Sequence, residues 1–182
     1  MARMRPDVIR EFLKQPHSCV LASLRADGRP YTVPLWFLWQ GEVDDDAHPL
    51  HNPPRGHFWF TGTLSRVWCK QLMRDPRVSF CIERSAPAPG HIGVDGVAEA
   101  CTLPEFDIWP TSRLLAEKYV GRGDPANDDA VDAFFANMQT EPRMLFKITP
   151  EVWRAIDLTV YRGKREDREF QEQVRERLAA EA

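Results

Sequence analysis

Residues 56–80, with the sequence GHFWFTGTLSRVWCKQLMRDPRVSF, contain the pattern that decides the fold expected for this chain. The bulky segment His57–Phe60 is typical of a buried strand, and the small residues Thr61-Gly62-Thr63 after it favour a turn. Ser65 suits a helix N-cap, and apolar residues then recur at helical spacing until Asp75-Pro76 ends the helix. The apolar positions, expected on the core face, are Leu64, Val67, Trp68 and Leu72. The stretch therefore predicts a strand, a turn, a helix and a second strand.

Basic side chains recur every fourth residue along the predicted helix, at Arg66, Lys70 and Arg74. The free N–H groups in the first turn of a helix carry partial positive charge and favour an anion. Two of the cations lie close to that turn, which indicates a phosphate-binding site. A basic stripe is also common on helix surfaces that bind nothing, so the spacing alone leaves both interpretations open.

Length and composition indicate one domain, spanning residues 1–182. The chain has a mass of 21.0 kDa, enough to close one substantial core. Apolar residues make up 43% of it, and no apolar run is long enough to span a membrane. The first residues are basic with no apolar segment behind them, so we expect a cytoplasmic protein rather than a secreted one. A net charge of −3 argues against nucleic acid as the main partner.

Cysteines and histidines show no metal-binding pattern. The four cysteines, without a CxxC pair, lie far apart among apolar residues and are expected to be buried free thiols. They are Cys19, Cys69, Cys81 and Cys101. His48 and His51 lie near three aspartates, but the surrounding segment is rich in proline and lacks a rigid element. We therefore interpret residues 41–56 as a solvated hairpin insertion and expect no metal site.

The remaining strands and helices suggest an antiparallel sheet. A short amphipathic helix is expected at residues 6–14. Strands are expected at residues 18–24, 30–40, 77–84, 90–102, 143–149 and 152–158. Asp27-Gly28 is typical of a tight turn, Gly93 and Gly96 allow a bulge, and Pro150 separates the last two strands. Short connections between strands favour a β-dominated α+β fold built on an antiparallel barrel over residues 17–160.

Two amphipathic helices lie between the predicted strands. Their apolar positions are Leu114, Leu115, Tyr119 and Val120 in the first, and Val131, Phe134, Phe135 and Met138 in the second. The first is expected to end at Gly121, and the second to begin at Asn127-Asp128-Asp129. Both are expected to cross over the barrel. The densely charged segment 164–182 is expected to form a helical tail.

The order of residues around the predicted turn resembles the pyridoxamine 5'-phosphate oxidase-like family of FMN-binding split barrels. The similar features are Thr61, the pair Ser65-Arg66, and a helix that ends in Asp75-Pro76-Arg77-Val78-Ser79. The segments VPLWF, RLLAEKYVG and KITPEVW are similar to other parts of the family, so the resemblance covers about residues 5–160. It implies an antiparallel split β-barrel of the Greek-key type with flanking crossover helices. In that family the Thr, Ser and Arg bind the phosphate of FMN.

Several residues depart from the pattern of the oxidases. Val67 stands where they have a Lys after the Ser-Arg pair, and Lys70, one turn on, is expected to replace that charge. Val33 and Leu38 stand where they have an Arg and a Lys that hold the flavin, and their closing substrate motif has no counterpart after Trp153. Pyridoxamine 5'-phosphate is therefore not the expected substrate. The apolar VPLWF strand is similar to the broader group of this fold that uses FMN or the deazaflavin F420.

The resemblance implies an oxidoreductase that binds FMN or F420, acts on an unknown small molecule, and forms a homodimer with the cofactor at the subunit boundary. The expected cofactor-binding residues are Val33, Pro34, Leu35, Trp36, Thr61, Ser65, Arg66 and Lys70. Trp36 or Trp59 would provide an apolar wall for the flavin ring, and no catalytic acid or base is apparent. Two other functions remain open: a non-catalytic carrier or sensor that binds flavin or haem, and a cofactor-free interaction module.

Overall fold

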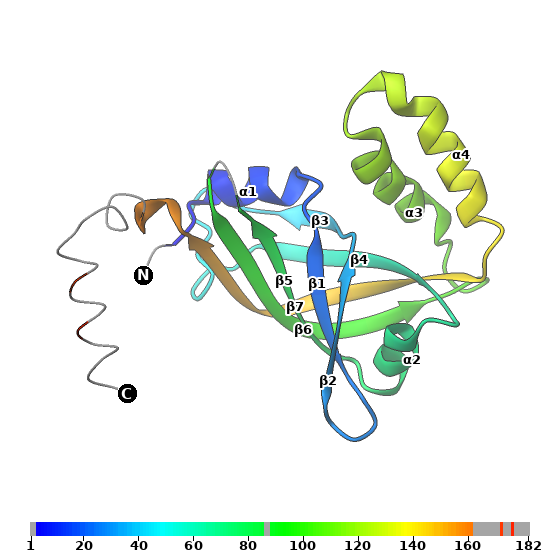
Figure 1. The fold of residues 1–182 in the computed structure, drawn as a ribbon, viewed down its shortest axis with the longest axis horizontal. Coiled ribbons are helices and arrows are strands. Elements are labelled where there is room, and N and C mark those ends of the chain that lie inside the picture. The colour runs from blue at the N-terminus through cyan, green and yellow to red at the C-terminus, as the bar shows by residue number, and fades with distance from the viewer. Residues whose placement is uncertain (1–2, 86–87, 162–171, 173–175, 177–182) are drawn as a thin grey trace.

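The computed structural model describes residues 3–85 and 88–161, together with residues 172 and 176. Its centre is a seven-stranded antiparallel sheet with the strand order β2-β1-β5-β6-β7-β4-β3 (Figure 1). The strands are β1 (Cys19–Leu24), β2 (Pro30–Leu35), β3 (Leu38–Glu42), β4 (Arg55–Thr63), β5 (Arg77–Arg84), β6 (Gly90–Cys101) and β7 (Arg143–Asp157). The helices are α1 (Pro6–Lys14), α2 (Val67–Arg74), α3 (Trp109–Ala116) and α4 (Asp128–Met138), with the short turns η1 (Glu117–Gly121), η2 (Pro125–Asn127) and η3 (Thr159–Tyr161).

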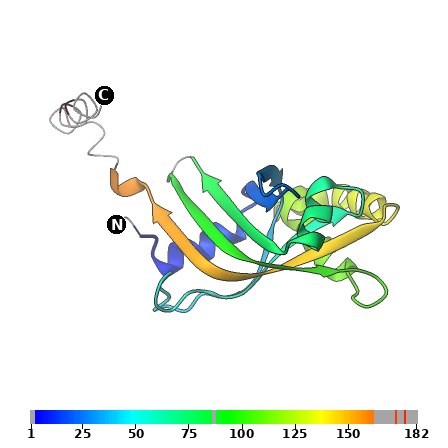
Figure 2. The ribbon, with the colours of Figure 1, turned by 90° about the horizontal axis from the view of Figure 1, so that it is seen from below.

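The long strands β6 and β7 curve strongly, so that the sheet curls around an aromatic core without closing (Figure 2). Their register shifts between Asp95 and Gly96, where a bulge increases the local bend. A Cβ atom on Gly96 would lie 2.4 Å from the carbonyl oxygen of Thr149, so only glycine allows this close approach of the two backbones. Phe58, Phe80 and Trp153 fill the concave side. The β-dominated α+β split-barrel fold expected from the sequence is confirmed.

Two predicted strand boundaries are wrong. Residues 30–40 form two strands rather than one, because the chain leaves β1 after Leu35 and pairs with β4 from Leu38 onward. This segment therefore supplies both edges of the open sheet. Residues 143–157, in contrast, form the single strand β7, because Pro150 lies opposite Gly96 at the bulge, where a missing N–H is tolerated.

The helices occupy the ends of the curled sheet. The predicted helix at residues 6–14 is confirmed as α1, which buries Ile9, Phe12 and Leu13. The predicted end at Asp75-Pro76 is confirmed for α2, which buries Trp68 and Leu72. Helices α3 and α4 pack side by side beyond one end of the sheet, joined through η1 and η2 (Figure 1). They cover the corner where the chain passes from β2 to β3.

Some local predictions concern single side chains. Cys19, Cys69 and Cys101 are buried free thiols as expected, but Cys81 is exposed because it points outward from β5.

The expected hairpin insertion is the β3–β4 connection, in which Glu42 pairs with Arg55. The predicted tail at residues 164–182 lies outside the described residues, apart from 172 and 176. Within the described part of the chain, no helix is long and apolar enough to cross a membrane.

Candidate functional site

Three of the residues expected to bind an anion, Thr61, Ser65 and Arg66, line a cavity of about 460 Å³ between β2, β4 and the N-terminal end of α2. Its lining consists of Tyr31, Val33, Pro34, Leu35, Thr61, Gly62, Ser65, Arg66, Val67, Trp68 and Arg143. Four of these residues, Pro34, Leu35, Thr61 and Arg143, also line a second cavity of about 230 Å³. The second cavity is completed by Trp36, Leu115, Ala116, Phe134 and Met138. The two cavities therefore adjoin, with the polar one at α2 and the apolar one against α3 and α4.

The backbone around α2 differs from the predicted turn. β4 continues through Thr63, so Thr61 and Gly62 lie within the strand rather than in a turn. Arg66, not Ser65, occupies the N-cap position, and the Ser65 hydroxyl shares a hydrogen bond of 2.9 Å with the Thr63 hydroxyl. The N–H of Arg66 donates to the carbonyl of Thr63 at 3.0 Å, which closes the turn. Ser65 and Arg66 are thereby held at the mouth of the first cavity.

Gly62 lets α2 pack directly on β4. A Cβ atom at this position would lie 2.4 Å from the Cys69 sulfur and 2.7 Å from the Trp68 ring. Burial raises the pKa of the Cys69 thiol to about 12, so this sulfur stays protonated and acts as packing. Leu64 and Val67, which were expected on the core face, are 46% and 52% exposed. The expectation was wrong because Leu64 lies in the turn between β4 and α2, and Val67 is only the first residue of the helix.

Two buried polar atoms of the site have no hydrogen-bond partner among the described residues: the Thr61 hydroxyl and the Nε atom of Arg143. Thr61 lies in the middle of the site, since it lines both cavities. The Arg143 side chain is only 17% exposed and forms an ion pair with Glu141. Leaving a buried donor or acceptor unpaired costs about 1–3 kcal/mol. The unpaired Thr61 hydroxyl and the unpaired Arg143 Nε atom therefore point to a polar ligand at this place.

The sequence did not indicate Arg143. It lies opposite Thr63 in the β4–β7 pairing and so reaches the site from a strand far downstream. A basic residue at the start of a predicted strand was the only available signal. Lys70, in contrast, is exposed on α2 and does not line either cavity, and neither does Trp59. The structure brings together all the predicted cofactor-binding residues except Lys70.

Trp36 forms part of an aromatic group at the second cavity. Its indole stacks on Tyr119 at a centroid distance of 4.7 Å and lies 5.5 Å from Phe134. It remains 37% exposed despite these contacts. A flat apolar surface is therefore available beside the polar cavity.

The charges of the site favour an anion. Arg66 and Arg143 line the first cavity, and neither cavity is lined by Asp, Glu, His, Lys or Cys. The unpaired Thr61 hydroxyl and the Ser65 hydroxyl add hydrogen-bonding groups suited to phosphate oxygens. This set fits a ligand with a phosphate at one end and a flat apolar ring at the other. Among residues 3–85 and 88–161, no group of His, Cys, Asp and Glu could hold a metal ion.

Comparison with known proteins gives one family match and several similar folds. The family model described as pyridoxamine 5'-phosphate oxidase matches residues 6–157. No curated protein matches the sequence. The conserved hypothetical protein Rv2991 from Mycobacterium tuberculosis has a similar structure, with a TM-score of 0.63, 23% identity and coverage of 86% of either chain.

Two other similar structures are those of proteins with a named function. An F420 reductase has a TM-score of 0.54 and 21% identity over 80% of this chain and 94% of its own. The heme storage protein HutZ from Vibrio cholerae has a TM-score of 0.57 and 20% identity over 84% of this chain and 98% of its own. At such identities, the three structures show a common fold.

Proposed function

Because the chain belongs to the pyridoxamine 5'-phosphate oxidase family, we propose that it is an oxidoreductase that binds FMN or F420 and acts on a small molecule. The observation that carries the proposal is the pair of adjoining cavities, one with arginine and hydroxyl side chains and one with apolar walls. FMN and F420 both join a phosphate-bearing chain to a flat ring system. The size and order of the two cavities suit such a molecule.

Arg66, Ser65 and Thr61 would hold the phosphate, as expected from the sequence. Arg66 offers a planar set of donors that matches phosphate oxygens, and its position beside the first turn of α2 adds the field of the free N–H groups. Arg143 would add a second positive charge beside the phosphate. Lys70, which was expected to supply this charge, does not line the cavity. The Nε atom of Arg143, which has no partner among the described residues, gives this role a physical basis.

The ring would lie along β2, against the backbone of Val33, Pro34, Leu35 and Trp36. When bound, the cofactor supplies the electron or hydride transfer. The chain would orient the ring and exclude water with Trp36, Leu115 and Phe134. No His, Lys, Asp or Glu lines either cavity, so general acid–base catalysis by the chain is not part of the proposal.

The test is to identify any chromophore that purifies with the full chain and then to titrate the chromophore-free protein. A yellow protein that is bleached by a reductant and recovers in air, with FMN or F420 identified by mass, would support the proposal. Micromolar or tighter binding of one of these cofactors to the chromophore-free protein would support it equally. A Soret band would replace it with a haem-binding carrier, and failure to bind any of the three would replace it with a cofactor-free module.

We also infer that the chain forms a homodimer through the outer face of β1, β5 and β6. Small or apolar side chains on this face surround a shallow depression of about 310 Å³. They are Val20, Ala22, Ser79, Cys81 and Gly93, and His91 and Arg154 lie at its margin. Val20, the second residue of β1, is 48% exposed in the single chain. A second copy of the chain would cover it.

A cytoplasmic location remains a proposal. All four cysteines are free, and Cys81 is exposed in the single chain. Free exposed thiols are typical of a reducing compartment. Fractionation of the native host, with detection of the untagged chain, would test this location.

A further inference from the structure

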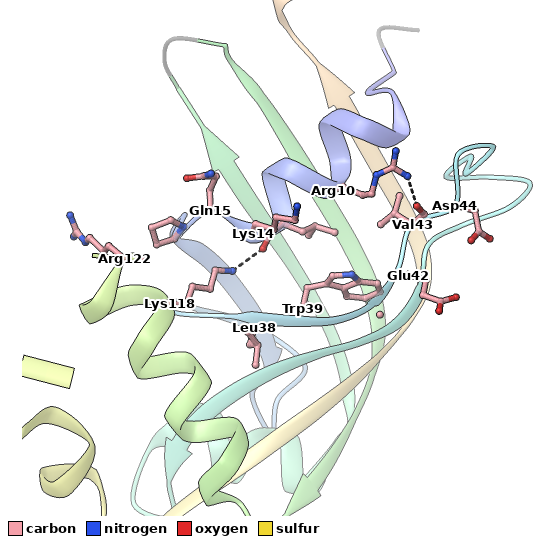
Figure 3. A pocket seen from close by; sticks show the side chains of 14 residues that line it. Arg10, Lys14, Gln15, Leu38, Trp39, Glu42, Val43, Asp44, Lys118 and Arg122 are labelled. Atoms are coloured by element: carbon pink, nitrogen blue, oxygen red, sulfur yellow. Dashed lines mark hydrogen bonds between the residues drawn. The ribbon is translucent and has the colours of Figure 1, made fainter. Parts of the chain in front are cut away.

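A separate cavity of about 940 Å³ lies between α1, β3 and the turn η1 (Figure 3). It shares no lining residue with the two cavities of the proposed flavin site. Its volume is at the upper end of the range for small-molecule sites, about 300–1,000 Å³. The proposed function makes no use of it.

Lys118 is the most enclosed charged group of this cavity. Its ammonium donates to the carbonyl of Leu13 at 2.9 Å and to that of Phe37 at 3.1 Å, and it lies 3.6 Å from the centre of the Phe37 ring. Figure 3 shows it extending from η1 toward the C-terminal end of α1. No carboxylate in the described part of the chain forms an ion pair with it. The ammonium is thus partly removed from water without a neutralising charge.

The cations at the same end of the cavity also lack a close acid. Lys14 approaches Glu11 only to 3.9 Å, with both side chains largely exposed. Arg122 donates to the carbonyl of Tyr119 at 3.2 Å and forms no ion pair with a described residue. The C-terminal end of α1 contributes about half a negative charge, which offsets only a small part of three cations. This end of the cavity therefore has a surplus of positive charge.

The opposite end of the cavity is slightly acidic, because three carboxylates pair with only two arginines there. Asp44 and Glu42 both pair with Arg55, at 2.9 and 3.7 Å. Arg10 donates to the carbonyl of Val43 at 2.6 Å and pairs with Asp45 at 2.9 Å. The acids here are engaged in their own ion pairs, so they do not compensate the cations at the other end.

Trp39 forms an apolar wall between the two ends. Its ring packs at 4.7 Å from Phe58 and at 5.3 Å from Trp153, and these buried rings fix its position. A Cβ atom on Gly41 would lie 2.6 Å from the Trp39 ring, so glycine at that position makes room for the indole on the strand. In Figure 3, the indole lies between β3 and α1 within the cavity.

We propose that this cavity binds a small aromatic molecule with a phosphate or carboxylate group, the anion contacting Lys118 and Lys14 and the ring lying against Trp39. The anion would supply the charge that Lys118 lacks. The ring would cover the apolar wall. The anionic group matches the cation that has no ion-pair partner among the described residues. The ring matches the apolar surface of Trp39, which no described side chain covers within the cavity.

Phenyl phosphate is a suitable probe, and the full chain labelled with nitrogen-15 is a suitable protein. Burial lowers the pKa of Lys118 to about 7, so the titration is made below this pH, where the ammonium is charged. We expect saturable binding that shifts the indole resonance of Trp39, assigned with Trp39→Phe. Lys118→Met should weaken binding about tenfold or more, because a charge-assisted hydrogen bond is lost. Lys70→Met removes an exposed lysine outside the cavity and should leave the affinity unchanged. No saturable binding, or equal affinity in Lys118→Met and Lys70→Met, would overturn the proposal.

Two controls address folding and the position of the probe. If Lys118→Met does not fold, Lys14→Met removes an exposed cation of the same cavity and should weaken binding several-fold. Arg66→Ala should leave the titration followed at the Trp39 resonance unchanged, even though it weakens any binding of the probe at the proposed flavin site. An equal loss at the Trp39 resonance would place the probe in the flavin site and overturn the inference. Benzyl alcohol should bind much more weakly than phenyl phosphate, and equal affinity would also overturn it.

Discussion

The indole of Trp36 lies parallel to the phenol ring of Tyr119, with their centroids 4.7 Å apart and an angle of 4° between the planes. The Tyr119 hydroxyl accepts a hydrogen bond from the N–H of Phe37 at 3.1 Å and donates one to the carbonyl of His17 at 2.7 Å. Tyr119 therefore connects η1 to the corner between β2 and β3 and to the segment before β1. The position of Trp36 at the apolar cavity depends on this connection.

Tyr119→Phe should lower the free energy of unfolding by about 1–3 kcal/mol, because the N–H of Phe37 and the carbonyl of His17 lose their partner at a buried place. The stack on Trp36 should remain, since the ring is unchanged. Urea unfolding measures the loss. Tyr161→Phe, at an exposed tyrosine, is the matched control and should have little effect. A stability of Tyr119→Phe equal to that of the control would show that the connection contributes nothing.

Thr61→Val should separate stability from binding. The Thr61 hydroxyl has no partner in the described part of the chain, so an apolar group of the same shape should leave the free energy of unfolding unchanged or raise it. If this hydroxyl contacts the cofactor phosphate, the affinity for FMN should fall about two- to tenfold. Calorimetric titration with FMN and with riboflavin, which lacks the phosphate, measures both effects. Equal losses for the two ligands would place Thr61 away from the phosphate.

Arg66→Ala should weaken FMN or F420 about tenfold or more, because a charge-assisted hydrogen bond to an anion contributes about 1.5–3 kcal/mol. Arg143→Ala should also weaken binding, and the double variant should lose less than the sum if both arginines contact one phosphate. Lys70→Ala is the matched control, since Lys70 lies outside both cavities. A larger loss in Lys70→Ala than in Arg143→Ala would reverse the assignment and restore the expectation from the sequence.

The pH dependence of stability should report Lys118. Burial lowers the pKa of its ammonium to about 7, from an ordinary value of 10.5, and the titratable groups around it are His17, Cys19 and Tyr119. Below pH 7, both the folded and the unfolded chain hold the proton. Between pH 7 and about 10, the unfolded chain keeps the proton that the folded chain has released, so stability rises with pH in this interval.

The comparison variant for this effect is Lys118→Met, which lacks the titrating group. We expect the free energy of unfolding of the unaltered chain, minus that of the variant, to increase from pH 7 toward pH 10. His17, Cys19 and Tyr119 are present in both proteins, so most of their own titration cancels in this difference. A difference that is constant with pH would show that the ammonium is as well solvated in the folded chain as in the unfolded one.

Local features of the chain could be predicted from the sequence because local rules determine them. The helix at residues 6–14 follows from its apolar periodicity, and the end of α2 follows from Asp75-Pro76. The meeting of Thr61, Ser65 and Arg66 at one cavity could also be predicted, because only a few residues separate them.

Features that depend on tertiary structure could not be predicted. Arg143 reaches the site through the pairing of β7 with β4, which no local pattern encodes. The four-residue spacing of Arg66 and Lys70 predicts that both lie on one helix face. The length of the cavity along that face depends on the tertiary structure, so the spacing could not show that Lys70 lies outside it. The break at Trp36 and Phe37 depends on Tyr119, whose hydroxyl binds the backbone there.

The last prediction concerns the homodimer. Val20→Lys should convert a dimer into a monomer near 21.0 kDa, because it places an ammonium in the middle of the proposed interface. Val20 is 48% exposed in the single chain, so the substitution should not unfold it. Leu50→Lys, at a 72% exposed residue of the β3–β4 connection, is the matched control and should stay dimeric. Sedimentation at micromolar concentration measures the mass. If the cofactor lies at the subunit boundary, Val20→Lys should also bind FMN or F420 more weakly than Leu50→Lys does. An unaltered chain that sediments as a monomer with the cofactor bound would contradict both the dimer and the shared site.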